Sequence, residues 1–483
     1  MKHQLEMSPV EMREYGYRVI DYLVEHFESQ SEKSPTCFAS RSEMDELLPA
    51  AIPFEECSPN EVLQHVVEDV LSNCGNNSHP RNYAFVPGPS NFISCMGDAL
   101  ASGYNVFTGS WAAAPAGVKV EIILINWLLE LFGLPIKEGG GVFTSGGSMA
   151  NLTAIVTARR KLCGEDFSHA TVYLSSQTHS SNFKALSILG FKNDQVRVIP
   201  VSSDFKCDVG KLHDAVTDDM VQGKRPLCVI ASAGTTNTGT IDPLEAIADI
   251  CKEHNLWLHV DAAFGGAAIL SEHASLQFRG IERADSITVD PHKWFFQPYE
   301  IGCVLVRNRF DLSDTFTEKP EYLRDIEGNI SEINFYDHGV QLTRNFKALK
   351  LYMSLKTFGL EAFKSAVDYS LNLASETETI LKSQGCWEII SPATLAVIVF
   401  RFNLSDKEGD QSDDDDQISL VNQKISDEMT ATGQAFLATT SIRNQIVLRM
   451  CLINPRATID DVTMTIENCR EIGTHYWLES QVN

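Results

Sequence analysis

Short apolar segments rich in β-branched residues alternate with longer amphipathic segments from about residue 115 onwards. The apolar segments are TVYL from 171, VRVI from 196, LCVIA from 227, WLHV from 257 and SITV from 286. This alternation is typical of a mainly parallel sheet that helices cover on both faces. A further segment, GCVLV from Gly302, follows SITV after only a short loop, so we expect it to pair antiparallel.

The N-terminal region shows helical periodicity and no strand pattern. Ser8, Pro9 and Glu11 have the form of a helix start, with Ser as the cap and Glu placed to complete a capping box. We predict an amphipathic helix to about Phe27 and a second helix, NEVLQHVVEDVLSNC, from residue 60. These helices cannot form a core alone, which favours a partner subunit as their support.

The C-terminal region combines a helical run over 348–383 with two strand-like segments, LAVIVFRF from 395 and IVLRMCLI from 446. This pattern predicts three parts: a helical dimerisation segment (1–90), a large sheet domain (91–350) and a small α+β domain (351–483). The acidic segment 406–417, DKEGDQSDDDDQ, lies between the two strands. We interpret it, including its most acidic part at 410–417, as a solvated loop; a cation site is the alternative.

Composition narrows the range of partners. Asp and Glu number 64 against 39 Lys and Arg, and the net charge of -25 repels nucleic acid and anionic membrane surfaces alike. No stretch is long and apolar enough to span a bilayer, and charges spread through the N-terminus argue against a secretory signal. The 12 cysteines are scattered without metal-binding spacing, so we expect reduced thiols, a cytoplasmic location and no metal site.

Reactive residue types follow the predicted strands at their carboxyl ends, where open α/β sheets bind ligands. Asp261 ends WLHV, Thr235 follows LCVIA, and Lys293 follows SITV shortly before the apolar residues Trp294 and Phe295. Burial there would lower the pKa of the lysine amine toward a nucleophilic form. Each residue alone has an ordinary structural explanation, but an acid and a lysine at the ends of neighbouring strands together indicate a site.

Two further features extend this site. The turn before Ser148, within GGGVFTSGGSMAN, leads into a helix whose exposed amides suit a phosphate group. Tight packing is the alternative explanation for this turn, since the dinucleotide fingerprint GxGxxG is absent. His179 follows TVYL and is either a hydrogen-bonded structural residue or a ring that stacks on a flat heterocycle.

Taken in order, these motifs resemble those of the group II pyridoxal-phosphate decarboxylases, which act on aromatic amino acids, histidine, glutamate and cysteine sulfinate. The resemblance covers about residues 78 to 365 and is carried by SHPRNYAFVPGPSN, GSWAAAPAGVKVE, SGGSMAN, SSQTHSS, ASAGTTNTGTIDPL, LWLHVDAAFGGAAIL, ADSITVDPHKW and LTRNFKALKLYMSLK. HVDAA and PHKW place Asp261 and Lys293 at 293 − 261 = 32 residues apart, which is a specific signal. The family implies a fold type I architecture with a seven-stranded, mainly parallel sheet.

The resemblance also implies roles for individual residues. Pyridoxal 5'-phosphate is the implied cofactor, bound by Lys293 as a Schiff base, by Asp261 at the pyridine nitrogen and by His179 against the ring. The remaining implied cofactor contacts are Gly147, Ser148, Thr235, Ala263 and His292. The implied catalytic residues are Lys293, Tyr322, His179 and His292. The implied substrate side comprises His79, Tyr83, Phe85, Gly109, Trp111 and Arg344.

The family implies a homodimer in which Tyr322, from a mobile loop, lies over the partner's active site. We expect decarboxylation of an aromatic L-amino acid to its amine. Trp294 resembles the aromatic and histidine branch of the family, whereas Gly109 replaces a bulky aromatic residue and would enlarge or reshape the pocket. The alternatives are a non-aromatic substrate (glutamate, aspartate, cysteine sulfinate, diaminobutyrate or histidine) and an aldehyde synthase on the same scaffold.

Overall fold

The computed structural model describes residues 5–48, 51–318, 332–404 and 411–481, with the side chains of 411–414 left out. Its centre is a seven-stranded sheet in the order β1-β7-β6-β5-β4-β2-β3. Only β7 runs antiparallel to its neighbours, as predicted from its short connection to β6. The strands are β1 (Gly140–Thr144), β2 (Ala170–Ser175), β3 (Val196–Ile199), β4 (Arg225–Ser232), β5 (Trp257–Asp261), β6 (Ser286–Val289) and β7 (Gly302–Val306).

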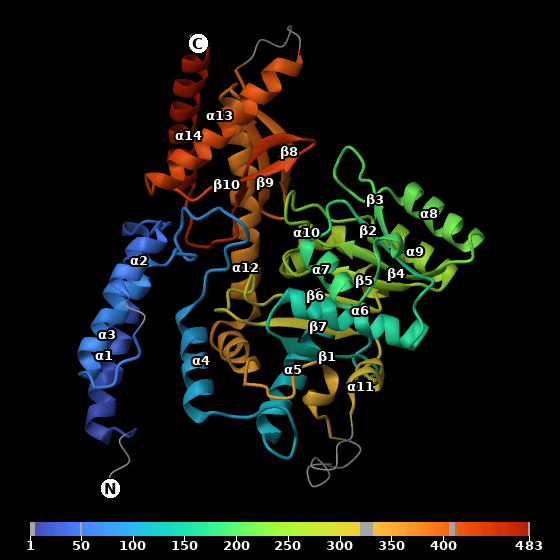
Figure 1. Ribbon diagram of the computed structural model, residues 1–483, viewed down its shortest axis with the longest axis horizontal. Coiled ribbons are helices and arrows are strands. Elements are labelled where there is room, and N and C mark those ends of the chain that lie inside the picture. The colour runs from blue at the N-terminus through green and yellow to red at the C-terminus, as the bar shows by residue number, and fades with distance from the viewer. Residues whose placement is uncertain (1–4, 49–50, 319–331, 405–410, 482–483) are drawn as a thin grey trace.

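Both faces of this sheet are buried, which explains why its strands read as continuous apolar runs. In β4, Cys228 and Ile230 belong to one hydrophobic cluster, while Val229 and Ala231 belong to the other. Helices supply the cover on each side (Figure 1). They are α5 (Pro115–Leu131), α6 (Gly147–Cys163), α7 (Ser180–Ile188), α8 (Val209–Val221), α9 (Leu244–His254), α10 (Glu272–Ser275) and α11 (Phe310–Phe316).

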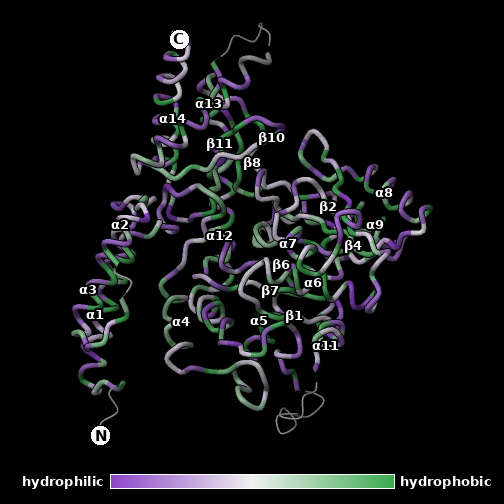
Figure 2. Tube along the Cα trace, viewed as in Figure 1, coloured by the Kyte–Doolittle hydropathy of each residue, from purple (hydrophilic) through white to green (hydrophobic). Residues whose placement is uncertain are grey.

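A smaller antiparallel sheet, in the order β10-β11-β9-β8, lies beside the C-terminal helices. Its strands are β8 (Trp387–Thr394), β9 (Val397–Phe402), β10 (Ala438–Ile442) and β11 (Gln445–Cys451). The helices are α12 (Ala348–Ser383), α13 (Gln411–Ala431) and α14 (Ile459–Ser480). Green segments of the hydropathy tube gather between these helices and the sheet (Figure 2). The predicted α+β arrangement of this region is therefore present, with β8 and β10 as strands that the sequence did not reveal.

Two sequence predictions in this region need correction. The helix over 348–383 is interrupted at Gly359, whose positive φ of 73° breaks it into two segments. The acidic segment is not a loop throughout, because α13 begins at Gln411. Asp415 accepts hydrogen bonds from Arg401 and Gln445, so this carboxylate joins the helix to the small sheet.

The N-terminal helices extend along one side of the molecule (Figure 1). They are α1 (Pro9–Glu28), α2 (Arg41–Leu47) and α3 (Pro59–His65), and α4 (Phe92–Tyr104) follows them. Ser8 and Glu11 form the predicted capping box at the start of α1. The prediction of the second helix is wrong beyond His65. A π-helical turn and a 3₁₀ turn follow there, because the segment is rich in valine and has low helix propensity.

The two ends of the chain differ in burial. No residue of α1 is buried, although the helix is amphipathic, whereas α14 has a row of buried residues. Across the described ranges, no helix combines the length and apolar character needed to cross a membrane. The fold thus places its buried surface around the two sheets, and the first helix has only half-buried and exposed residues in a single chain.

Candidate active site

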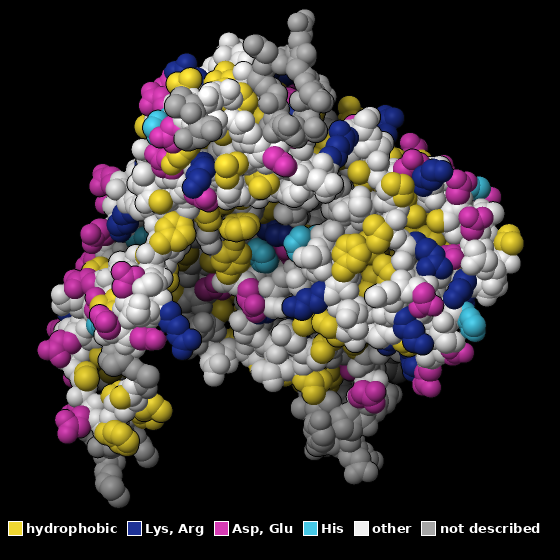
Figure 3. Space-filling view, turned by 45° about the horizontal axis from the view of Figure 1, so that its top comes forward, with side chains coloured by type: hydrophobic (Ala, Val, Ile, Leu, Met, Phe, Trp, Pro, Cys, Tyr) yellow, Lys and Arg dark blue, Asp and Glu magenta, His cyan; other side chains and the backbone are white. Residues whose placement is uncertain are grey.

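A cavity of about 340 Å³ lies at the carboxyl ends of the parallel strands. Its walls come from the segments that follow β1, β2, β4, β5 and β6, which is where a mainly parallel sheet binds ligands. The surface of the molecule is hollowed near the middle of the face drawn in Figure 3, with histidine side chains at the edge. Predicted site residues that line the cavity are Gly147, Ser148, His179, Thr235, Asp261, Ala263, His292 and Lys293.

The turn between β1 and α6 forms one end of the cavity. Helix α6 begins at Gly147. The amides of Met149 and Ala150 donate to the Gly146 carbonyl, which leaves those of Gly147 and Ser148 as the donors at this end of the cavity. A Cβ atom at Gly147 would lie 2.8 Å from Asp290 Oδ2, and this close approach requires glycine. The Ser148 hydroxyl adds a further donor, and the arrangement suits a phosphate group.

Asp261, the last residue of β5, is held as a carboxylate. Its Oδ2 accepts hydrogen bonds from the side-chain amides of Asn151 (2.9 Å) and Asn182 (2.8 Å). Burial by itself raises the pKa of Asp261, but the positive charge of Lys293, with His259 and Asn182, outweighs burial and leaves this pKa below its usual value. An ionised acid in this position can pair with a protonated ring nitrogen.

A buried chain of hydrogen bonds orients Asn151. Trp257 Nε1 donates to Ser286 Oγ (2.8 Å), which lies 2.9 Å from His259 Nδ1, and His259 Nε2 lies 3.0 Å from Asn151 Oδ1. Because Asn151 Oδ1 only accepts, His259 Nε2 carries the proton and Nδ1 accepts from Ser286. Burial lowers the pKa of His259 to about 4, which keeps the ring neutral. The Asn151 amide nitrogen is thereby turned toward Asp261.

Lys293 follows β6 and reaches into the same cavity. Its Nζ lies 3.1 Å from Asp290 Oδ2, and Asp290 is 2% exposed. Burial alone lowers the pKa of Lys293, as the sequence led us to expect, but the carboxylates of Asp290 and Asp261 outweigh burial and raise this pKa. The amine that the sequence predicted to be nucleophilic is therefore protonated while these two carboxylates face it.

His179 caps the N-terminus of α7. Its Nδ1 accepts a hydrogen bond from the Ser181 amide (3.2 Å) and lies 2.8 Å from Ser181 Oγ. Burial lowers the pKa of His179, and an accepting Nδ1 is consistent with a neutral ring. The ring therefore presents an uncharged face to the cavity.

His292 and Thr235 complete the cavity walls. His292 Nδ1 accepts from the Ile301 amide (3.2 Å), and its ring centroid lies 5.0 Å from that of Tyr299. Burial lowers the pKa of His292, so this ring is also neutral. Thr235 Oγ1 lies 2.8 Å from Thr238 Oγ1 and accepts from the Thr240 amide, which fixes the hydroxyl at the end of β4.

The residues predicted to contact substrate lie outside this cavity in a single chain. His79 and Tyr83 are buried, with exposures of 0% and 1%, and Tyr83 belongs to the hydrophobic core. Phe85 is exposed and contacts Phe436 edge to face at 5.7 Å. The Trp111 amide donates to Asn334 Oδ1.

Gly109 lies next to the ring of Phe107. A Cβ atom at this position would lie 2.2 Å from the ring of Phe107. The neighbouring phenylalanine therefore occupies the volume next to Gly109. An aromatic surface is retained there through a different residue.

Arg344 has a supporting position. Its Nη2 donates to Glu121 Oε1 (2.6 Å) and to the Phe143 carbonyl (2.9 Å), and its Nη1 donates to the Thr108 carbonyl. These bonds join α5 and β1 to the segment that carries Gly109. Tyr322, the predicted loop tyrosine, lies outside the described residues.

Several residues at the site were missed in the sequence. They are Asn151 and Asn182 at Asp261, His259 behind Asn151, and Asp290 at Lys293. Asp290 and His259 lie within the motifs DPHKW and HVDAA, so their place beside the predicted residues was a usable signal. Asn151 likewise ends the motif SGGSMAN, whereas Asn182 lies outside the motifs named above and reaches β5 only through the packing of α7.

The geometry agrees with comparisons to known proteins. Residues 42–403 match the family model described as the pyridoxal-dependent decarboxylase conserved domain. The chain belongs to this decarboxylase family. It is 41% identical to an aromatic-L-amino-acid decarboxylase of Bacillus atrophaeus, over 96% of this chain and 95% of that protein. A phenylacetaldehyde synthase of Arabidopsis thaliana is 28% identical over 93% of each chain.

Solved structures of this decarboxylase family share the fold. The crystal structure of Oryza sativa TDC with PLP and tryptamine has a TM-score of 0.92 and 26% identity, covering 98% of this chain and 99% of that one. The predicted fold type I architecture, the decarboxylase activity and the pyridoxal-phosphate cofactor are therefore confirmed. The residues around the cavity fit this cofactor, since an anion site, an ionised acid and a lysine surround one space.

Proposed function

We propose that this decarboxylase converts an aromatic L-amino acid to the corresponding amine and carbon dioxide, and that it works as a homodimer. The observation that carries the proposal is the placement of Lys293 and Asp261 in one cavity whose end is the N-terminus of α6. The three groups match the aldehyde, the ring nitrogen and the phosphate of the cofactor. When bound, pyridoxal phosphate supplies an electron sink for the pair left on Cα as carbon dioxide departs.

The residues of the chain prepare this chemistry in distinct ways. The amides at the start of α6 and the Ser148 hydroxyl would hold the phosphate, and the negative charge of Asp261 would favour a proton on the ring nitrogen. His179 and Ala263 line the same cavity and would contact the cofactor ring. Asp290 Oδ2 lies 3.1 Å from Lys293 Nζ and would orient this amine.

An aromatic substrate is supported by two observations. The relative from Bacillus atrophaeus, named an aromatic-L-amino-acid decarboxylase, is 41% identical to this chain. In addition, Phe107 lies against Gly109 and Phe85 lies against Phe436, so aromatic surface is present where the substrate residues were predicted. Aldehyde formation is the second candidate, because synthases of phenylacetaldehyde are among the relatives at 27–28% identity.

A homodimer is supported by the uncovered N-terminal helices. Helix α1 has no buried residue, yet it carries apolar side chains such as Val10, Tyr17 and Val24 that are exposed in a single chain. A second copy that covers this helix would remove that apolar surface from water. We further propose that Tyr322 reaches the partner's cavity and returns the proton to Cα.

A cytoplasmic location is supported by the state of the thiols. All twelve cysteines are free, and seven of them are buried. Burial raises the pKa of Cys207, Cys228 and Cys303, so these thiols are protonated and unreactive. Such a set of unpaired cysteines suits a reducing compartment.

The test is a panel of amino acids scored separately for carbon dioxide, amine and aldehyde. We expect tryptophan, tyrosine, phenylalanine or dihydroxyphenylalanine to give equal amounts of carbon dioxide and amine. Glutamate, aspartate, cysteine sulfinate, histidine and diaminobutyrate serve as the non-aromatic set. Faster turnover of that set would refute the substrate class, while aldehyde in place of amine would identify a synthase.

A further inference from the structure

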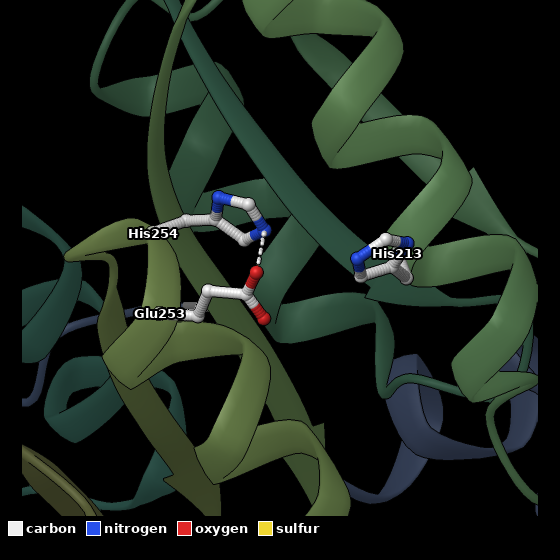
Figure 4. A group of neighbouring side chains, drawn as sticks. All are labelled: His213, Glu253 and His254. Carbon is white, nitrogen blue, oxygen red and sulfur yellow. Dashed lines mark ion pairs between the residues drawn. The ribbon is translucent and has the colours of Figure 1, made fainter.

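We propose that His213, Glu253 and His254 form a binding site for a divalent late transition metal ion, with Zn²⁺ as the reference ion. The three residues lie on the outer surface of the large domain, away from the cofactor cavity. His213 comes from α8, and the other two end α9 (Figure 4). The site therefore bridges two helices that cover the seven-stranded sheet.

The donor atoms already lie close together. One ligand atom from each residue lies within 4.8 Å of the others, and His254 Nε2 is 3.9 Å from Glu253 Oε1. Zinc bonds of about 2.0–2.1 Å place tetrahedral ligand atoms roughly 3.3 Å apart. The ligand atoms must therefore close by up to about 1.5 Å. His213 and Glu253 are exposed and free to make this movement.

His254 gives the second, independent indication. Its side chain is only 14% exposed, and its Nε2 is buried without a hydrogen-bond partner among the described residues. The 3.9 Å separation from Glu253 is too long for a hydrogen bond. A buried ring nitrogen without a partner costs free energy, and a metal ion at this position would satisfy it. Figure 4 shows the Glu253 carboxylate beside this nitrogen and the His213 ring on the opposite helix.

The donor set determines the class of ion. Two imidazoles and one carboxylate suit Zn²⁺, Cu²⁺ or Ni²⁺, whereas Mg²⁺ and Ca²⁺ prefer oxygen ligands. The fourth coordination position faces solvent and would hold water. The two ring centroids lie 5.8 Å apart at 56°, so the rings are not stacked face to face in a way that competes with metal binding.

Nearby charges affect cation binding at this site in opposite directions. The C-terminus of α9 bears the negative end of its dipole, and Glu253 adds a full negative charge, so both attract a cation. Lys224 and Arg225 line a neighbouring surface hollow together with His254 and oppose binding. We therefore expect exchangeable binding at this site, weaker than in a closed structural zinc site.

Calorimetric titration of the purified holoenzyme with Zn²⁺ tests the proposal. We expect one site per chain, and His213→Ala should weaken binding at this site by about 10-fold or more. Glu253→Gln, which keeps the shape but removes the charge, should weaken it less. Since binding to the folded state stabilises it, Zn²⁺ should raise the melting temperature of the wild type more than that of His213→Ala.

Two controls make the outcome decisive. His169→Ala removes an exposed histidine outside the cluster and should leave Zn²⁺ binding unchanged. The double variant Cys57→Ser, Cys74→Ser removes the exposed thiols and should also leave it unchanged. Equal affinity in His213→Ala and the wild type, loss of the site in either control, or no stoichiometric site in the wild type would overturn the proposal.

Discussion

Residues around the cofactor cavity are buried in a single chain, whereas those of the first helix are not. Around the cavity, Asp261, His259 and Asn151 are buried and joined by hydrogen bonds. Helix α1 has no buried residue at all. The groups that fit the cofactor are thus brought together within one chain, whereas the exposed apolar side chains of the first helix support the proposed homodimer.

Replacement of Lys293 should have the largest effect. Lys293→Ala removes the amine that bonds to the cofactor, and turnover should fall by about 1,000-fold or more, because release of product depends on this amine. The cofactor should still bind through α6 and Asp261, which remain intact. Borohydride reduction and peptide mapping of the wild type should label Lys293 alone. Lys364→Ala, which removes a partly exposed lysine paired with Glu272, is the control, and label on any other lysine contradicts the assignment.

Mixing of inactive variants tests whether two chains build each site. Tyr322→Phe should yield less amine, with some aldehyde, ammonia and peroxide under air. When equal amounts of Lys293→Ala and Tyr322→Phe chains are mixed, half of the dimers are mixed and each has one intact site. Amine formation should therefore recover to about a quarter of the wild-type rate.

The matched control for this mixing experiment is Lys293→Ala with Asp261→Asn. Both residues line the cavity of the same chain, so no mixed dimer has an intact site and activity should stay low. Recovery in this control would show that the cavity itself is shared between chains. A fully active monomer in sedimentation would rule out the dimer.

The hydrogen-bond chain behind Asp261 should have an intermediate effect. His259→Leu leaves Asn151 free to turn its oxygen toward Asp261, and the cofactor should bind about 10-fold more weakly. The absorption of the bound cofactor should also change, since Asp261 no longer holds the ring nitrogen as firmly. His338→Leu is the control, because His338 is also buried but lies near Arg344 and Phe335. Equal changes in both variants would indicate a loss of packing only.

Asp290 should act mainly on the protonation of Lys293. Asp290→Asn removes a carboxylate that raises the pKa of Lys293, so this pKa should fall. The pH at which the absorption of the lysine-bound cofactor changes should move in the same direction. Asp249→Asn, which removes a surface acid, serves as the control. An unchanged pH midpoint would show that Asp261 alone controls the lysine.

The smallest expected effect is the loss of folding stability at acidic pH. Burial lowers the pKa of His79 and of His259 to about 4, below the ordinary value of 6.5. The unfolded chain therefore binds protons that the folded chain does not, and stability is lost as the pH falls from about 6.5 to 4. Each histidine contributes at most about 1.4 kcal/mol per pH unit. The melting temperature, measured across this pH range, should depend less steeply on pH in His259→Leu than in the wild type. An unchanged slope would contradict the assigned pKa.

The sequence predicted those features that depend on local pattern. Continuous apolar segments identified five parallel strands because both faces of the sheet are buried, and the residues directly after these strands identified Lys293, Asp261 and His179. Strands β1, β8 and β10 were missed. Their segments contain Gly140, Pro392 or runs of Thr and Ser, so their strand character depends on pairing with neighbours.

Only the tertiary structure showed which side chains contact and orient the predicted site residues. Asn151 and Asn182 come from two helices that pack against β5, and no periodicity relates them to Asp261. The same is true of His213 and His254, which are 254 − 213 = 41 residues apart and meet where α8 passes α9. The local sequence determines whether a segment forms a helix or a strand and which residue stands at its end. Contacts between side chains from distant segments depend on how the elements pack, because packing sets distances that the chain order does not contain.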